Sequence, residues 1–291
     1  MEKQQIYFSI FTKPWKMGLD RLGEFVAGLG FDGIELPVRD GYPVEPAQVE
    51  KLPQATRQLA RQGVRVFSIA GPSDERTLAA CAEAGIPIIR VMVPIDAEGY
   101  LATETRMRRE YDRLLPLLEQ YGVKLGIQNH SGRYIANANG LRHLIEGYDP
   151  RRIGAVWDAA HNALNGEEPE LALEILWSHL CMVNLKNATW VRKSAPEGTH
   201  VSEAGWEPYW TGGRQGLASW PRVAAELTRR GYRGVICLTA EYSDPAIVDR
   251  QIAEDLAYAR SLFKRSLESR TGLAGWSISV PPASWNRRLI Q

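Results

Sequence analysis

The charges of this 291-residue chain nearly cancel, with 35 Lys and Arg residues against 34 Asp and Glu residues, and they are scattered along the sequence. This pattern excludes a strongly basic surface of the kind that binds nucleic acid or an anionic membrane, so a small molecule is the expected partner. The amino terminus lacks the apolar core of a signal peptide, and no segment approaches the roughly 18 apolar residues of a membrane span, which predicts a cytoplasmic location.

Short apolar segments recur along the chain, and each is followed by a segment with helical spacing of its apolar residues. The first kind of segment predicts β-strands. The predicted strands span 6–11, 31–38, 64–71, 86–93, 123–128, 153–157, 181–186 and 234–241.

Predicted helices fill the intervals between these strands and follow the last one. They span 18–29, 46–62, 74–85, 103–121, 138–147, 169–177, 218–230 and 246–265. Strict alternation of eight strands with eight helices predicts a single α/β domain over residues 1–265, a (β/α)8 TIM barrel. An open doubly wound sheet would need fewer or reordered strands.

Two segments do not fit this alternation. Residues 188–217 form the longest stretch without a regular period and are rich in Gly, Trp and polar residues, so we expect an irregular loop that covers a site. Residues 266–291 show no strong period and contain two prolines, which predicts a C-terminal extension outside the barrel.

Polar residues follow the predicted strands at the point where the chain leaves the sheet, as in IGAVWDAAH at 153–161 and VICLTAEY at 235–242. In TIM barrels the active site lies at the carboxyl ends of the strands, so these positions are candidates for function. They are Glu35, Arg90, Gln128, His130, Asp158, His161, Asn184, Lys186 and Glu241.

Four of these residues, on the fifth to eighth strands, are expected to converge on one point: Gln128, Asp158, Asn184 and Glu241. All four offer oxygen ligands and two are anionic, which suits Mg²⁺ or Mn²⁺ better than a metal that prefers thiolates. For Asp158 the alternative is that its side chain only caps the following turn.

Several motifs together resemble the xylose isomerase-like sugar isomerase and epimerase barrels. They are GFDGIEL at 30–36, DAAH at 158–161, NLKN at 184–187, GRQGLASW before the seventh predicted helix, and the AE that ends the eighth strand. The resemblance extends over residues 6–265 and implies the same barrel fold.

The resemblance also implies a divalent metal held by Glu, Asp, His and Glu on the fifth to eighth strands, with the two Glu residues shuttling protons. Asp158 and Glu241 match this pattern, whereas Gln128 replaces the first Glu and Asn184 replaces the His. Metal affinity should therefore be weaker than in the family. Because an amide does not titrate, Gln128 cannot act as a base, which leaves Glu241 as the predicted base and metal ligand.

Two further residues complete the predicted catalytic set. The resemblance aligns His161 with the histidine of the DxxH motif, which contacts a substrate oxygen, and Lys186 with the lysine of the seventh strand, which could hold an anion or a hydroxyl group. The alternatives are a hydrogen-bonded turn histidine and an exposed loop lysine.

Substrate contacts are predicted for residues around the same rim. Glu35 matches a carboxylate that borders the family's pocket, although it could instead pair with Arg90 or Arg65, and His130 is expected to lie behind the residues that touch the substrate. The predicted substrate-binding residues are Glu35, Arg90, His130, Trp15 and Arg214.

Tryptophans are frequent near the same rim, and they predict an aromatic wall against a sugar ring. They are Trp15, Trp157, Trp190, Trp206 and Trp210, of which Trp157 has burial in the core as its alternative.

Taken together, these features predict a sugar isomerase or epimerase-like enzyme that acts on a polyhydroxylated carbonyl compound through a metal-stabilised enediolate. A lyase or dehydratase of the same fold is the second interpretation, and a non-catalytic binding subunit with a degenerate metal site is the third. Two-base epimerisation is disfavoured because Gln128 removes one of the two bases, so 1,2-isomerisation or β-elimination is favoured. A homo-oligomer is compatible with the sequence.

Overall fold

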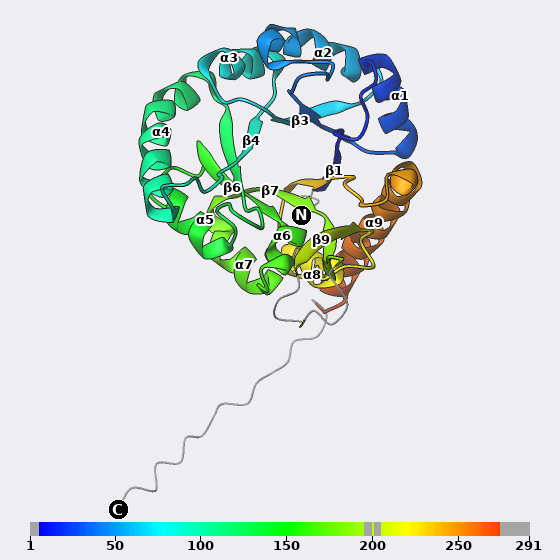
Figure 1. The fold of residues 1–291 in the computed structure, drawn as a ribbon. Helices are drawn as coiled ribbons and strands as arrows, with labels where there is room; N and C mark the ends of the chain where they lie inside the picture. Colours follow the sequence, from blue (N-terminus) through cyan, green and yellow to red (C-terminus); the bar gives the residue numbers. More distant parts are fainter. Residues whose placement is uncertain (1–5, 195–199, 201–204, 274–291) are drawn as a thin grey trace, which may run out of the picture.

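The computed structural model describes residues 6–194, 200 and 205–273 of the chain, and these form a closed barrel of eight parallel strands ringed by helices (Figure 1). Around the barrel the strand order is β1-β10-β7-β6-β5-β4-β3-β2. The strands are β1 (Ile6–Phe11), β2 (Gly33–Pro37), β3 (Arg65–Ala70), β4 (Ile88–Met92), β5 (Lys124–Gln128), β6 (Ile153–Asp158), β7 (Leu180–Leu185) and β10 (Gly234–Leu238). The predicted fold is therefore confirmed.

The α-helices follow the strands in sequence and form the outer ring seen in Figure 1. They are α1 (Leu19–Leu29), α2 (Leu52–Ala60), α3 (Glu75–Ala84), α4 (Tyr100–Tyr121), α5 (Ala138–Ile145), α6 (Ala159–Leu164), α7 (Pro169–Leu176), α8 (Trp220–Arg229) and α9 (Val248–Leu273). None of the described helices is long and apolar enough to cross a membrane.

The strands are mainly apolar because the helices cover their outer faces and side chains fill the barrel inside. All six residues of β6 are buried, for example. In the interior, the Ser68 hydroxyl of β3 lies 3.6 Å from the Met182 sulfur of β7, although these two strands are not neighbours in the sheet.

The inner face of the barrel changes from apolar to polar along the strand direction. Because side chains alternate between the two faces of a strand, Asp158 shares the inward face with Val156, and Asn184 shares it with Met182. Val156 and Met182 belong to an apolar cluster, whereas Asp158 and Asn184 lie one step nearer the carboxyl ends. The polar residues therefore gather at the carboxyl mouth of the barrel, which is where the sequence predicts the site.

The prediction of an irregular loop over 188–217 is wrong in part. Strands β8 (Asn187–Arg192) and β9 (Trp206–Thr211) form an antiparallel hairpin there. Residues 189–192 of β8 and 207–210 of β9 alternate between half-buried and exposed side chains, a short period of two that the many Gly and polar residues around them obscured.

Three helices also differ from the predicted ones. The predicted helix over 46–62 is divided into a 3-10 turn, η1 (Pro46–Lys51), and α2, because Gln48 has a non-helical backbone. The DAAH motif continues into the short helix α6, which was not predicted. The last helix runs to Leu273 instead of 265, and the prediction of an extension stays untested beyond it because residues 274–291 lie outside the described residues.

The close packing at the start of β2 generates a stability prediction. A Cβ atom on Gly33 would lie 2.2 Å from the Arg65 carbonyl oxygen and 2.7 Å from the Phe67 ring, so Gly33→Ala should lower the free energy of unfolding by about 1–3 kcal/mol. Gly28, within α1, has no atom within 4 Å of the equivalent position, and Gly28→Ala should instead raise it by about 0.5–1 kcal/mol. Urea unfolding of both variants tests this difference, and equal effects would contradict it.

Candidate active site

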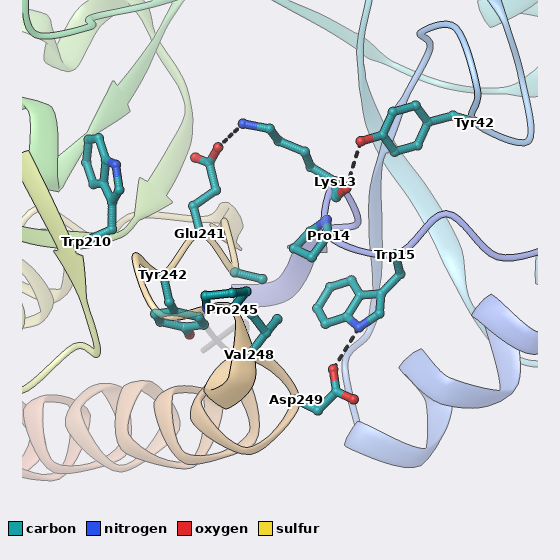
Figure 2. Close-up of a pocket in the computed structure, with 11 residues that line it drawn as sticks. Lys13, Pro14, Trp15, Tyr42, Trp210, Glu241, Tyr242, Pro245, Val248 and Asp249 are labelled. Atoms are coloured by element: carbon teal, nitrogen blue, oxygen red, sulfur yellow. Dashed lines mark hydrogen bonds and ion pairs between the residues drawn. The ribbon is translucent and has the colours of Figure 1, made fainter.

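A cavity of about 610 Å³ opens at the carboxyl mouth of the barrel, where the loops after β1 and β10 meet (Figure 2). Trp15, a predicted substrate contact, lines it, and its indole N–H donates to Asp249 at 2.8 Å. The other lining residues are Lys13, Pro14, Tyr42, Trp210, Ala240, Glu241, Tyr242, Pro245, Val248 and Asp249.

Glu241 projects into this cavity and forms ion pairs with two lysines. One carboxylate oxygen contacts the Lys13 ammonium group, and the other lies 2.6 Å from the Nζ of Lys186. Burial alone would raise the pKa of Glu241, but Lys186 and Lys13 outweigh it and lower the pKa to about 2. Glu241 is therefore ionised at neutral pH and holds a proton poorly.

The backbone before Glu241 is strained. Ala240 has a φ of 53°, the one positive φ at a non-glycine position in the described part of the chain. A left-handed alanine costs roughly 1–2 kcal/mol, and such strain is typical of functional sites. This turn aims the Glu241 side chain back across the mouth toward Lys13 (Figure 2).

Lys186 is the most enclosed cation at the mouth after Arg90, since only 6% of its side chain is exposed. Its Nζ atom lies 3.6 Å from the centre of the Trp210 ring, which reaches over it from β9 of the hairpin. A cation over an aromatic face is held by the ring's negative potential as well as by Glu241. The alternative of an exposed loop lysine does not match this position.

Asp158 ends β6 and caps α6. One of its oxygens accepts the backbone N–H groups of Ala160 at 3.0 Å and His161 at 3.1 Å, and the other accepts the Gln128 amide at 2.9 Å. Burial raises the pKa of Asp158 to about 6, although Lys186 and the His161 N–H act in the opposite direction. Asp158 thus makes the capping contacts that the sequence offered as an alternative, and its second oxygen contacts Gln128.

A buried chain of polar contacts leads from Glu35 to Gln128. The Arg90 guanidinium pairs with Glu35 through Nε at 2.8 Å and 2.9 Å and also donates from Nη1 to the Gln128 carbonyl oxygen. The Ser68 hydroxyl also donates to Glu35, at 3.0 Å. Arg90 is therefore the partner of Glu35, whereas Arg65 packs over Tyr7 and Phe67.

Asn184 is the exception in this network. Its side chain is fully buried, and neither its amide oxygen nor its amide nitrogen has a hydrogen-bond partner among the described residues. Unsatisfied buried amides are rare in folded proteins, because each costs about 1–3 kcal/mol. The Asn184 amide therefore keeps unused hydrogen-bonding capacity at the mouth.

The four predicted metal ligands do not fit a divalent ion in this arrangement. Gln128 and Asp158 are bonded to each other, Glu241 is held by two lysines, and Asn184 alone is uncommitted. Within the described residues, no group of three or more His, Cys, Asp or Glu side chains is placed to hold a metal. A metal would have to displace ammonium groups from Glu241 and a hydrogen bond from Asp158.

His130 and His161 stack at the mouth with ring centres 3.9 Å apart, and the His161 ring lies edge-on to Trp210 at 5.2 Å. Burial lowers the pKa of His130, and burial followed by the nearby Lys186 lowers the pKa of His161 well below its usual value. Both imidazoles are therefore neutral at pH 7.

The remaining predicted contacts are only partly brought together. Arg214 stacks on Tyr258, with 3.6 Å from its guanidinium carbon to the ring centre, and it is not among the residues that line the cavity. Trp157 is fully buried and donates to Asn162, so the alternative of burial in the core applies to it. Trp190 and Trp206 are exposed on the hairpin. Trp15 and Trp210 are the two of the five that reach the cavity.

Sequence reasoning missed Lys13 and Ser131. Lys13 follows β1 by two positions, so the rule that points to strand ends would have found it. Ser131 contacts both His130 and His161, and nothing in its sequence position indicates this.

The family model described as xylose isomerase-like TIM barrel matches residues 24–262 of the chain. The chain belongs to this family. Among curated proteins, the inosose dehydratase of Bacillus velezensis is 24% identical to this family member over 140 residues, which are 47% of each chain. The chain thus matches about half the length of that relative.

Solved structures share the fold of this xylose isomerase-like barrel at low sequence identity. An L-ribulose 3-epimerase is 15% identical, with a TM-score of 0.69 over 95% of this chain and 100% of its own. The D-psicose 3-epimerase of Clostridium cellulolyticum is 14% identical, with a TM-score of 0.65 over 88% and 99%. A probable 3-DHS dehydratase of Bacillus anthracis is 13% identical, with a TM-score of 0.63 over 86% and 98%.

The contacts of the predicted ligands generate a test of metal binding. We expect Mn²⁺ titrations followed by electron paramagnetic resonance to show weak binding to the natural sequence, because Glu241 is paired with lysines. Gln128→Glu combined with Asn184→His should tighten binding on the order of 10-fold or more, since it adds a carboxylate and an imidazole. Adding Glu241→Gln should remove the gain. Our interpretation would be contradicted if the natural sequence bound Mn²⁺ tightly and Glu241→Gln abolished that binding.

The raised pKa of Asp158 generates a pH prediction. A carboxyl whose pKa moves from 3.8 unfolded to about 6 folded binds protons more tightly in the folded state, so its contribution to stability falls as pH rises from about 4 to about 6. Asp158→Asn keeps an oxygen for the α6 cap but does not titrate. The unfolding free energy of the natural protein minus that of Asp158→Asn should fall over this pH range. A flat difference would place the Asp158 pKa near its ordinary value.

Proposed function

We propose that this protein is an enzyme that moves a proton next to the carbonyl group of a polyhydroxylated, sugar-like compound, by isomerisation or dehydration. The observation that carries the proposal is the buried Lys186 ammonium group, which lies on Glu241 and against Trp210 beside the neutral His161. Removing a proton next to a carbonyl places negative charge on its oxygen, and fixed positive donors in a water-poor site stabilise that charge strongly.

The cations of the mouth come from the chain itself. Lys186 and Lys13 both contact Glu241, a lining residue of the cavity, so both ammonium groups are held beside it. An enolate or enediolate oxygen would take its stabilisation from Lys186, with the unpaired Asn184 amide as a further donor. This route replaces the metal-stabilised enediolate expected from the resemblance, because the predicted ligands do not fit a divalent ion.

Glu241 serves mainly to position the lysines in this proposal. A carboxylate whose pKa is about 2 is a poor proton acceptor at neutral pH, so its predicted role as the base is weakened in this arrangement. Trp15 and Trp210 line the cavity and offer aromatic faces to the apolar side of a sugar ring.

Dehydration or isomerisation is favoured over two-base epimerisation. Gln128 offers no titrating group and is held between Arg90 and Asp158, so one face of a planar intermediate lacks the carboxylate that a second base would supply. The similarity to an inosose dehydratase agrees with elimination of water from a hydroxylated ketone. A carbohydrate-like substrate, a cytoplasmic location and a homo-oligomer remain predictions of the sequence.

The proposal is tested by deuterium uptake from D₂O into candidate substrates, followed by proton NMR with and without a chelator. The probes are an inosose, D-tagatose, L-ribulose and D-psicose. Lys186→Met should slow exchange roughly 100- to 1,000-fold, since it removes the main charged donor. Lys264→Met, at an exposed position of α9, is the control and should leave exchange unchanged. Undiminished exchange in Lys186→Met would overturn the proposal, and no exchange with any probe would favour a binding subunit.

A further inference from the structure

The two stacked histidines are fixed by opposite groups of one residue, Ser131. The Ser131 backbone N–H donates to the Nδ1 atom of His161 at 3.2 Å, and the Ser131 hydroxyl lies 2.9 Å from the same atom. The Ser131 backbone carbonyl lies 2.8 Å from the Nδ1 atom of His130.

These contacts assign the imidazole protons. A backbone N–H can only donate, so the Nδ1 atom of His161 has no proton and its Nε2 atom carries one. A carbonyl can only accept, so the Nδ1 atom of His130 carries the proton and its Nε2 atom has a free lone pair. Neither Nε2 atom has a hydrogen-bond partner within the part of the chain that the structure describes. The pair therefore offers one donor and one acceptor, on rings whose centres are 3.9 Å apart.

Other basic groups at the mouth are already committed. The Asp158 carboxylate accepts three N–H groups, Glu35 is held by Arg90 and Ser68, and Glu241 is held by two lysines. In contrast to Asp158, Glu35 and Glu241, His130 thus has a lone pair, on its Nε2 atom, that no described residue occupies. An unprotonated imidazole nitrogen without a hydrogen-bond partner can accept a proton from a substrate carbon.

We infer that His130 is the general base of this site and that His161 donates a hydrogen bond to the substrate carbonyl oxygen. The inference rests on the proposed function and names the residue that moves the proton. It differs from the sequence-based prediction, in which His130 lies behind the residues that contact substrate and Glu241 is the base.

The chemistry of the step follows from this assignment. The C–H bond next to the carbonyl breaks, its proton goes to the Nε2 atom of His130, and its electron pair forms a C=C bond. The carbonyl π electrons move to the oxygen, whose charge faces the His161 Nε2–H group and Lys186. In dehydration, the electrons return, the neighbouring C–O bond breaks, and the hydroxyl leaves as water with the proton from His130. In isomerisation, His130 returns the proton to the neighbouring carbon while a hydroxyl proton moves between the two oxygens.

The proton positions are tested without any substrate. Nitrogen-15 NMR of the full chain should show a protonated Nδ1 in His130 and a protonated Nε2 in His161 at pH 7, with the signals identified from the His130→Asn and His161→Asn variants. A protonated Nε2 in His130 would overturn the inference whatever the activity of the protein.

The catalytic role is tested by the same deuterium uptake into an inosose and the three ketoses. His130→Asn keeps an N–H group for the Ser131 carbonyl but has no atom equivalent to Nε2, so exchange should fall roughly 100- to 10,000-fold. His143→Asn is the matched control, because His143 lies at the surface and pairs with Glu104. Added imidazole should restore part of the exchange in His130→Gly, a response that a merely structural residue would not give.

The outcomes separate the two proposals. Exchange by the natural protein that persists in His130→Asn would overturn the role of His130 and leave the proposed function standing. Exchange lost in a folded His130→Asn and recovered in His130→Gly with imidazole would support it. No exchange by the natural protein with any probe would overturn the proposed function, and with it the role of His130.

Discussion

The buried guanidinium of Arg90 is the constraint on which the arrangement of the mouth depends. A charge enclosed by the barrel is tolerated only when it is paired and hydrogen-bonded, because removing its partner costs about 3–5 kcal/mol. Glu35 meets this requirement from β2, and the remaining N–H of Arg90 turns the Gln128 oxygen toward itself. The Gln128 nitrogen then has to face Asp158. One cation thereby determines the orientation of side chains on three other strands.

This chain of contacts also balances the charge of the mouth. Lys13, Arg90 and Lys186 supply three positive charges, and Glu35, Asp158 and Glu241 supply three carboxyl groups. A divalent ion added to this set would leave an excess of positive charge in a partly buried space, which is costly. In this site the chain's own cations already neutralise the carboxylates. The same cations can stabilise negative charge that develops on a substrate.

Sequence patterns predicted the barrel because βα alternation is a local property, carried by apolar periodicity and by the residues that end each element. They also placed Glu35, Asp158, Lys186 and Glu241 at one mouth, since strand ends follow from the same pattern.

Hydrogen-bond partners could not be predicted in this way. Whether Glu35 pairs with Arg90 or Arg65 depends on which face of each strand points into the barrel and on the register between neighbouring strands. The β-bulge between β2 and β3 changes that register. The hairpin β8–β9 was missed because its short alternation is weaker than the Gly and polar signals around it.

The bonds from Ser131 to the two histidines have an evolutionary consequence. Two of the three come from the main chain, which every amino acid carries, so drift at position 131 would leave the proton positions of both imidazoles largely intact. Proline is the exception, because it lacks the N–H group that fixes His161. The proton positions of the two rings therefore depend mainly on the course of the backbone at residue 131, and the buried hydroxyl adds one further contact to His161.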